Sequence, residues 1–166
     1  MAKTYRVTFA VRASNWLVER LLRLGLKMGF KDFPMVLLTV RGRKSGQPRT
    51  VPVVLSERDG KRYLVGTFGE VNWVRNLRAA GQAALTRGRH TEAISITELP
   101  PAEAARFLKQ IVSTAPGFIR GYFDVTPESS LEEFEREAPR HPIFRVQPAA
   151  PLAADATRDT VNSGAL

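Results

Sequence analysis

The sequence MVLLTVRGRKSGQPRTVPVVLSERDGKRYLVGT, residues 35–67, contains three of the strands that we predict for this protein. Apolar and β-branched residues concentrate at 35–41, 50–56 and 62–67, a pattern typical of strands. Asp59-Gly60 separates the second and third runs and predicts a tight hairpin turn, because both residues tolerate a positive φ. Pro52 favours an edge position or a bulge for the second strand, since proline cannot donate a hydrogen bond to a ladder.

The flanking sequence adds further short strands and single helices. Residues 83–87 and 91–98 predict an antiparallel pair, and weaker strand patterns occur at 4–12 and 142–146. Helices are predicted at 71–80, 101–112 and 130–138. This order favours an α+β, mainly β, fold: a small β-barrel or roll with peripheral helices. We expect one domain over residues 1–147 and a disordered tail over 148–166, where no apolar periodicity remains.

A basic amphipathic helix is predicted near the N-terminus, over about residues 14–29. Ser14 or Asn15 can cap it, and Gly29 can end it. One face carries Leu17, Leu21, Leu24 and Met28, and the opposite face carries Arg20, Arg23 and Lys27. The leucine face can pack on the barrel. Alternatively, the helix can lie on anionic lipid, with Trp16 near the headgroups. We favour the packed arrangement.

Composition excludes several classes of site. The chain has no cysteine and only two histidines, His90 and His141, which form no ligand pair. We therefore expect no metal site, no disulfide and no histidine-based catalytic triad. No signal peptide is evident, and no apolar run reaches the ~18–20 residues that span a bilayer. We expect a cytoplasmic protein that could touch the inner face of the cell membrane.

The net charge of +9 is concentrated in the first third of the sequence. Residues 1–50 carry eleven Lys and Arg against two acidic residues, whereas residues 51–166 carry fourteen of each. This asymmetry indicates an anionic partner at the basic end: a phosphorylated ligand, a membrane surface or nucleic acid. Nucleic acid is disfavoured, because no aromatic stacking platform accompanies the basic residues; Phe33 is the nearest aromatic side chain.

The basic segment RGRKSGQPR, residues 41–49, is the strongest candidate for an anion site. Gly42 and Gly46 allow backbone amides to approach an anion closely. Arginine side chains can grip phosphate or carboxylate in a bidentate manner, while Lys44 adds a point charge and Ser45 a hydroxyl donor. The segment is not a P-loop, since the Gly-x4-Gly-Lys order is absent. The alternative is an ordinary solvated hairpin turn.

Four blocks of sequence together resemble a known family. They are LLTVRGRKSGQPRTVPV, the turn at 58–61, YLVGTFG and NWVRNLRAAG, in this order and spacing. They resemble the deazaflavin-dependent nitroreductase and quinone reductase family, which uses coenzyme F420. The match runs from about residue 36 to 98, with weaker echoes at 118–123 and in APRHPIFRV. The resemblance implies a split β-barrel similar to FMN-binding and pyridoxamine-phosphate-oxidase barrels.

The resemblance also implies roles for individual residues. Arg43, Lys44 and Ser45 would meet the phosphate and the oligoglutamate tail of the cofactor. The strand from Arg49 onward would run beside the deazaflavin, with Val53 and Leu55 as an apolar wall.

The loop and helix that follow would complete this site. Trp73 and Asn76 would close it from a helix. Tyr122 lies in the segment that supplies a substrate-side tyrosine in related enzymes, where a phenol can polarise an oxygen or deliver a proton. The edge of the deazaflavin ring would contact the backbone of four loop residues: Gly66, Thr67, Phe68 and Gly69.

The implied activity is hydride transfer from reduced F420 to a quinone, a nitroaromatic compound or an activated alkene. One alternative is a binding module of the same fold that holds F420, FMN or a lipid without turnover. Two departures from the family pattern bear on affinity. The stretch before the tryptophan helix is compressed to residues 69–72, and Glu70 is an acidic neighbour for an acidic cofactor. The sequence specifies neither the physiological acceptor nor the oligomeric state.

Overall fold

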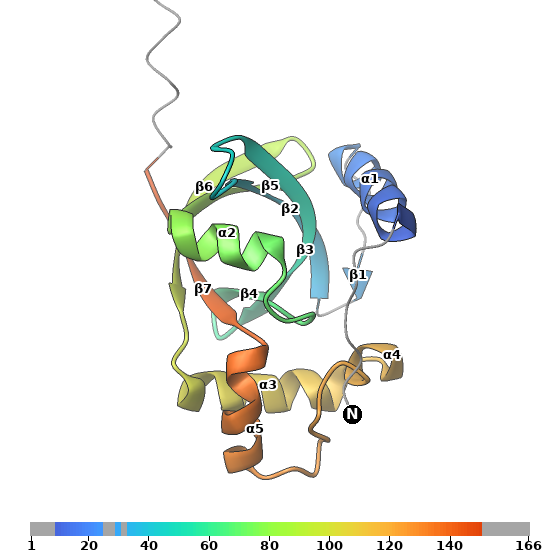
Figure 1. Cartoon of the computed structure of the whole chain (residues 1–166), viewed down its shortest axis with the longest axis vertical. Helices are drawn as coiled ribbons and strands as arrows, with labels where there is room; N and C mark the ends of the chain where they lie inside the picture. Colours follow the sequence, from blue (N-terminus) through green and yellow to red (C-terminus); the bar gives the residue numbers. More distant parts are fainter. Residues whose placement is uncertain (1–8, 25–28, 31–32, 151–166) are drawn as a thin grey trace, which may run out of the picture.

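A computed structural model describes residues 9–24, 29–30 and 33–150 (Figure 1). Six antiparallel strands form a closed barrel, with helices packed around it. In chain order the elements are α1 Phe9–Arg23, β1 Gly29–Phe30, β2 Phe33–Arg41, β3 Pro48–Arg58, β4 Lys61–Val65, α2 Asn72–Ala80, β5 Gln82–Arg87, β6 His90–Glu98, α3 Pro101–Thr114, α4 Gly117–Arg120, α5 Leu131–Glu137, the 3-10 turn η1 Ala138–Arg140, and β7 Ile143–Pro148.

The barrel closes because β2 pairs on both of its sides. The strand order is β2-β3-β4-β7-β6-β5, and β5 returns to β2 with Leu38 opposite Leu85. The two-residue β1 adds to β2. Alternate residues point inward, so the interior is filled by buried aliphatic side chains together with Phe144. The predicted mainly β barrel is therefore confirmed.

The predictions for Asp59-Gly60 and Pro52, within residues 35–67, are also confirmed. Asp59 and Gly60 adopt φ values of 51° and 68°, as the hairpin between β3 and β4 requires. Pro52 pairs with β2, whereas β3 pairs with β4 only from Leu55 onward. Proline is tolerated there because β3 has no β4 neighbour at that level.

Helix α2 covers one end of the barrel. Val74 and Leu77 have no exposed surface and belong to the interior cluster. The Trp73 ring lies 6.2 Å from that of Phe144 at 62°, so this tryptophan also packs on the barrel. Strands β2, β3 and β4 alternate in direction, so the β2–β3 hairpin and the end of β4 lie at the same end of the barrel. Helix α2 follows β4 and therefore lies at that end too.

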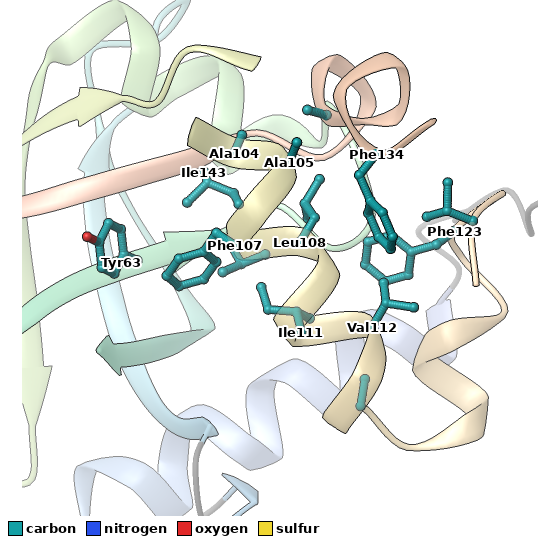
Figure 2. Packing of buried hydrophobic residues seen from close by; sticks show 14 residues of the cluster. Tyr63, Ala104, Ala105, Phe107, Leu108, Ile111, Val112, Phe123, Phe134 and Ile143 are labelled. Carbon is teal, nitrogen blue, oxygen red and sulfur yellow. The ribbon is translucent and has the colours of Figure 1, made fainter. Parts of the chain in front are cut away.

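A second apolar cluster joins α3 and α5 to the outside of the barrel (Figure 2). Phe107 of α3 packs on Tyr63 of β4, with ring centroids 4.5 Å apart. Phe134 of α5 is fully buried against the same helix. A capping box begins α5: the Ser130 Oγ accepts the Glu133 N–H at 3.3 Å, and the Glu133 carboxylate accepts the Ser130 N–H at 2.7 Å.

Helix α1 packs on the barrel wall but differs from the predicted helix. It begins at Phe9 and ends at Arg23, whereas we predicted about 14–29, and Gly29 lies in β1. The strand predicted at 4–12 is wrong from Phe9 onward, where the chain is helical. A short alternating pattern is weak evidence for a strand, and Ala10 and Ala13 favour a helix. Residues 4–8 and 25–28 lie outside the described residues.

The buried face of α1 is also rotated from the expected one. Leu22 is 5% exposed, while Leu17 and Leu24 are 51% and 73% exposed. The helix contacts β2, β3 and β5. Leu37 of β2 points outward on this wall and is nevertheless buried, which α1 explains. Helix packing was thus predicted correctly, but the contacting face was not.

The end of the barrel and the predicted tail overlap slightly. Pro148 pairs with Ile94, and the Ala149 N–H donates to the Ala93 carbonyl at 3.0 Å. Residues 151–166 lie outside the described residues. Within the described ranges, the structure contains no helix with the length and hydropathy needed to cross a bilayer.

Candidate functional site

The basic loop between β2 and β3 is compact. The Gly42 N–H donates to the Gln47 carbonyl at 2.8 Å, and the Gly46 N–H donates to the Gly42 carbonyl at the same distance. A Cβ on Gly42 would lie 2.7 Å from the Ser45 Oγ and 3.2 Å from the Gln47 carbonyl oxygen. Gly46 has a φ of 66°. Glycine at both positions therefore sets the loop's shape.

A groove of about 590 Å³ opens between this loop and α2. Among the described residues, its lining contains three cations and no acidic side chain. Trp73 lines it from α2, while Val40 and Val51 line it from β2 and β3. The cations are Arg43, Lys44 and Arg49, and none of them forms an ion pair with another described residue. The groove is therefore both cationic and partly apolar, as a site for an anion with an aromatic portion requires.

Asn76 fixes the orientation of Arg43. The Asn76 side chain is nearly buried, and its Oδ1 accepts the Arg43 backbone N–H at 3.2 Å and the Arg43 Nη1 at 2.9 Å. These bonds use one guanidinium nitrogen, so the remaining N–H donors of Arg43 are available to a ligand. Sequence reasoning placed Asn76 in contact with the cofactor; the structure gives it a role in positioning Arg43.

Glu70 does not oppose the positive charge of the groove. Its carboxylate pairs with Arg78 and lies 4.0 Å from the Arg75 Nε. The Arg78 guanidinium lowers the pKa of Glu70 below its ordinary value through a hydrogen bond and charge attraction. Arg78 also pairs with Glu98 at 2.7 Å. Glu70 is thereby held in an ion-pair network with Arg75 and Arg78, and it does not line the groove.

The loop at 66–69 connects β4 to α2 and is tightly packed. A Cβ on Gly66 would lie 3.1 Å from Pro142 atoms, and Gly69 has a φ of 80°. Phe68 is partly exposed, and its ring contacts that of Tyr122 edge-on at 4.8 Å. The substrate-side segment predicted around Tyr122 thus meets this loop directly.

A small apolar pocket of about 60 Å³ lies beside Thr67 of this loop. It forms where the outward face of β3 and the end of β4 meet α3 and α4. Thr67 contributes the one polar side chain of its lining. The apolar lining residues are Val54, Val65, Ile111, Ala115, Pro116 and Ile119.

The structure gathers most, but not all, of the predicted site residues. Arg43, Lys44, Ser45, Arg49, Trp73 and Asn76 surround the groove. Val53 and Leu55 do not line it, because strand alternation turns both side chains into the barrel core. Val54 faces outward instead, into the small pocket. We did not predict from the sequence that Val54, Asn72 and the α3–α4 residues line these cavities. For Val54, the alternation of side chains along β3 could have indicated that it faces outward.

No cluster of three potential metal ligands occurs within residues 9–24, 29–30 and 33–150. The family comparison then decides the chemistry. The model of the F420H(2)-dependent quinone reductase family matches residues 10–125. The chain belongs to this family. It is accordingly an F420-dependent reductase with a quinone-type small-molecule substrate.

Several solved structures are similar to this F420-dependent reductase. One, described as a domain-swapped dimer, is 26% identical with a TM-score of 0.48, and the match covers 83% of this chain and 97% of that one. Another, an F420-H2 dependent reductase (FDR-A), is 25% identical with a TM-score of 0.46, covering 72% and 99%. A third, an F420 reductase, is 17% identical with a TM-score of 0.41, covering 80% and 93%.

Proposed function

We propose that the cationic groove holds the phosphate and acidic tail of F420, and that the chain delivers the cofactor's hydride to a quinone. The observation that carries this proposal is the groove itself, with Arg43, Lys44 and Arg49 around a glycine-shaped loop and no acidic residue among the described residues that line it. A polyanionic tail needs such cations, and the backbone can approach it closely at Gly42 and Gly46.

The outward edge of β3 supports a path from the groove to the apolar pocket. Thr50 lines the groove, and Val54, on the same outward face of β3, lines the pocket. Four residues of strand span roughly 13 Å. An extended ligand whose tail lies at the loop would therefore bring its other end to residues 66–69. We place the deazaflavin ring there, and the quinone at the opening of the apolar pocket, over Thr67 and Ile119.

When bound in reduced form, F420 supplies the hydride, and the quinone becomes a hydroquinone by also taking up a proton. The chain's residues would bind, orient and exclude water. The apolar pocket would shield the acceptor from solvent. Tyr122, held against Phe68, is the residue we propose to polarise the acceptor oxygen or donate the proton. A nitroaromatic compound or an activated alkene could occupy the same pocket, because each offers a polar oxygen on a flat apolar body.

FMN is the alternative cofactor. Its tail is shorter than that of F420, so the affinities for the two cofactors distinguish the alternatives. We expect oxidised F420 to bind more tightly than FMN, because FMN ends in a single phosphate and reaches fewer cations of the groove. Competitive titration at fixed salt measures the difference. Equal or tighter binding of FMN would reject F420 as the preferred ligand. Tight F420 binding without quinone-dependent oxidation of the reduced cofactor would instead indicate a binding module.

We also propose a peripheral contact with the inner face of the cell membrane through α1. Trp16 and Leu17 are 62% and 51% exposed, and Arg20 and Arg23 lie on the same helix. Exposed apolar residues beside basic ones suit an anionic lipid surface. The contact would bring a cytoplasmic reductase close to a lipophilic quinone. It is secondary to the packing of α1 on the barrel.

A further inference from the structure

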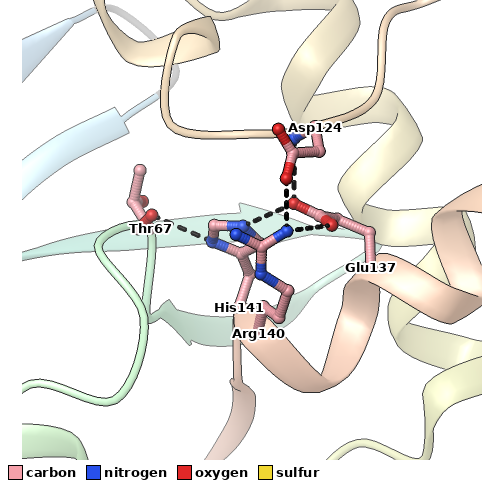
Figure 3. A network of polar contacts seen from close by, with 5 residues as sticks. All are labelled: Thr67, Asp124, Glu137, Arg140 and His141. Carbon is pink, nitrogen blue, oxygen red and sulfur yellow. Dashed lines mark hydrogen bonds and ion pairs between the residues drawn. The ribbon is translucent and has the colours of Figure 1, made fainter. Parts of the chain in front are cut away.

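His141 and Glu137 form a buried polar pair outside both cavities (Figure 3). They are 4% and 5% exposed. The His141 Nδ1 lies 2.9 Å from the Thr67 carbonyl oxygen, and the Nε2 lies 3.0 Å from the Glu137 Oε1. A carbonyl oxygen can only accept, so Nδ1 carries the hydrogen. Burial lowers the pKa of His141 below its ordinary value, and the contact with Glu137 opposes this change.

Glu137 ties the same pair to the segment that carries Tyr122. Its Oε1 accepts the Asp124 backbone N–H at 3.0 Å, and its Oε2 accepts the Arg140 Nη1 at 3.1 Å. Arg140 also pairs with the Asp124 carboxylate at 2.6 Å. Burial of these groups is costly unless each is paired, and this network supplies the partners. The network therefore connects α5 and η1 to the segment that follows α4.

The 66–69 loop packs closely on the backbone of the residues on either side of His141, so it has little room to move relative to them. The Gly66 N–H donates to the Pro142 carbonyl at 2.7 Å, and a Cβ on Gly69 would lie 3.2 Å from the Arg140 carbonyl oxygen. The Phe123 ring lies 4.2 Å from the His141 ring. A shift of His141 would consequently be transmitted to Thr67 and to the Phe68–Tyr122 contact.

We propose that His141 and Glu137 are positioning residues for hydride transfer. Through the Nδ1 bond to the Thr67 carbonyl, they hold the 66–69 loop against the segment that carries Tyr122. This inference rests on the proposed placement of the deazaflavin ring and the quinone beside the loop. Neither residue lines the groove or the pocket, so neither touches the reactants. Their effect would be geometric, because Thr67 lines the proposed acceptor pocket, and a shift of its backbone would change how the acceptor binds.

Two substitutions of His141 separate its two polar contacts. In His141→Asn the amide nitrogen takes the place of Nδ1 and can still donate to Thr67. In His141→Gln the amide reaches toward Glu137 and the Thr67 bond is lost. We expect His141→Asn to retain the acceptor KM, and His141→Gln to raise the KM for a short-chain naphthoquinone by about tenfold. The Kd for F420 should change less than the acceptor KM in both, because the tail binds at the hairpin.

Amide hydrogen exchange tests the positioning without any cofactor. Gly66 and Gly69 N–H groups are bonded to the Pro142 and Gly66 carbonyls. Their protection should fall in His141→Gln and in Glu137→Gln, and persist in His141→Asn. Ile94→Ala, in the barrel core far from the loop, is the control for lost stability alone; it should melt earlier with an unchanged acceptor KM.

Three results would overturn the proposal. One is nitrogen NMR of the wild-type protein that finds Nδ1 of His141 unprotonated. Another is unchanged protection and unchanged KM in His141→Gln. The third is lost protection with unchanged KM, which would make the pair a stability element only. Failure of F420 to bind the wild-type protein would instead reject the proposed function, while the exchange experiment would still report on the loop.

Discussion

At the scale of single residues, the site depends on cations whose charge is not neutralised within the described part of the chain. Arg43 is held by Asn76, whereas Lys44 and Arg49 extend from the loop into the groove. A charge that is held in place costs less side-chain entropy when it binds a ligand than a mobile one. The strength of binding should therefore depend on the loop and on α2 together.

Substitution of the loop cations should weaken F420 binding. We expect Arg43→Ala and Lys44→Ala each to cost about 1–3 kcal/mol, if each contact is a charge-assisted hydrogen bond. The loss should shrink as salt is added, because exposed charges are screened. Fluorescence titration measures it. Arg89→Ala, in the exposed turn between β5 and β6, is the matched control. Wild-type affinity in both loop variants would identify the loop as a solvated turn.

The bond between Asn76 and Arg43 should appear as energetic coupling. Asn76→Ala removes the acceptor that holds Arg43, so we expect it to weaken F420 binding even though it leaves every cation in place. In a double-mutant cycle with Arg43→Ala the two losses should not add, with an interaction energy of about 0.5–3 kcal/mol. Additive losses would show that Asn76 acts independently of Arg43.

At the scale of elements, α1 carries two different apolar faces. Leu22→Glu places a charge in the contact with the barrel wall, where Leu22 is 5% exposed. A loss of about 3 kcal/mol would follow, which lowers the Tm by roughly 6–12 °C. Leu17→Glu alters the exposed face and should leave the Tm unchanged. Differential scanning calorimetry compares the two variants.

Vesicle sedimentation with the same two variants tests the membrane contact. Leu17→Glu should reduce binding to anionic vesicles, because it removes an exposed apolar side chain and opposes the basic residues, each worth about 1 kcal/mol at the surface. Binding by the wild-type protein should fall with added salt. Equal sedimentation of wild-type protein and Leu17→Glu would argue against lipid contact through this face.

At the scale of the whole molecule, the barrel requires β7. β7 pairs with both β4 and β6, so its removal would open the barrel. We propose that the domain ends after the Pro148 and Ala149 contacts with β6, and that the remaining tail adds no stability, since its sequence has no apolar pattern. Deletion of residues 151–166 should leave the Tm within about 2 °C of wild type.

The contrasting deletion begins at residue 143 and removes β7. It should abolish cooperative unfolding, because the barrel cannot close without that strand. Circular dichroism melting curves distinguish the two cases. A large loss of Tm on removal of 151–166 alone would show that the tail docks on the domain.

Local chemistry alone determined several features of this protein. Runs of apolar and β-branched residues predicted the barrel strands from residue 35 onward, Asp59-Gly60 predicted a turn with positive φ, and the spacing of Ser130 and Glu133 suits a helix start. The cations and glycines at 41–49 predict an anion site, which stays a prediction. Each of these is a property of neighbouring residues, which sequence spacing records directly.

Other features were decided only by tertiary structure. Closure of the barrel pairs residues 37–39 with 84–86, and no local pattern encodes that contact. The same holds for the buried face of α1, for the bond of Asn76 to Arg43 and for that of His141 to Thr67. Val53 and Val54 look alike in sequence, yet one fills the core and the other lines a pocket. The physical reason is that burial and pairing depend on which distant surfaces meet, and only the closed chain determines that.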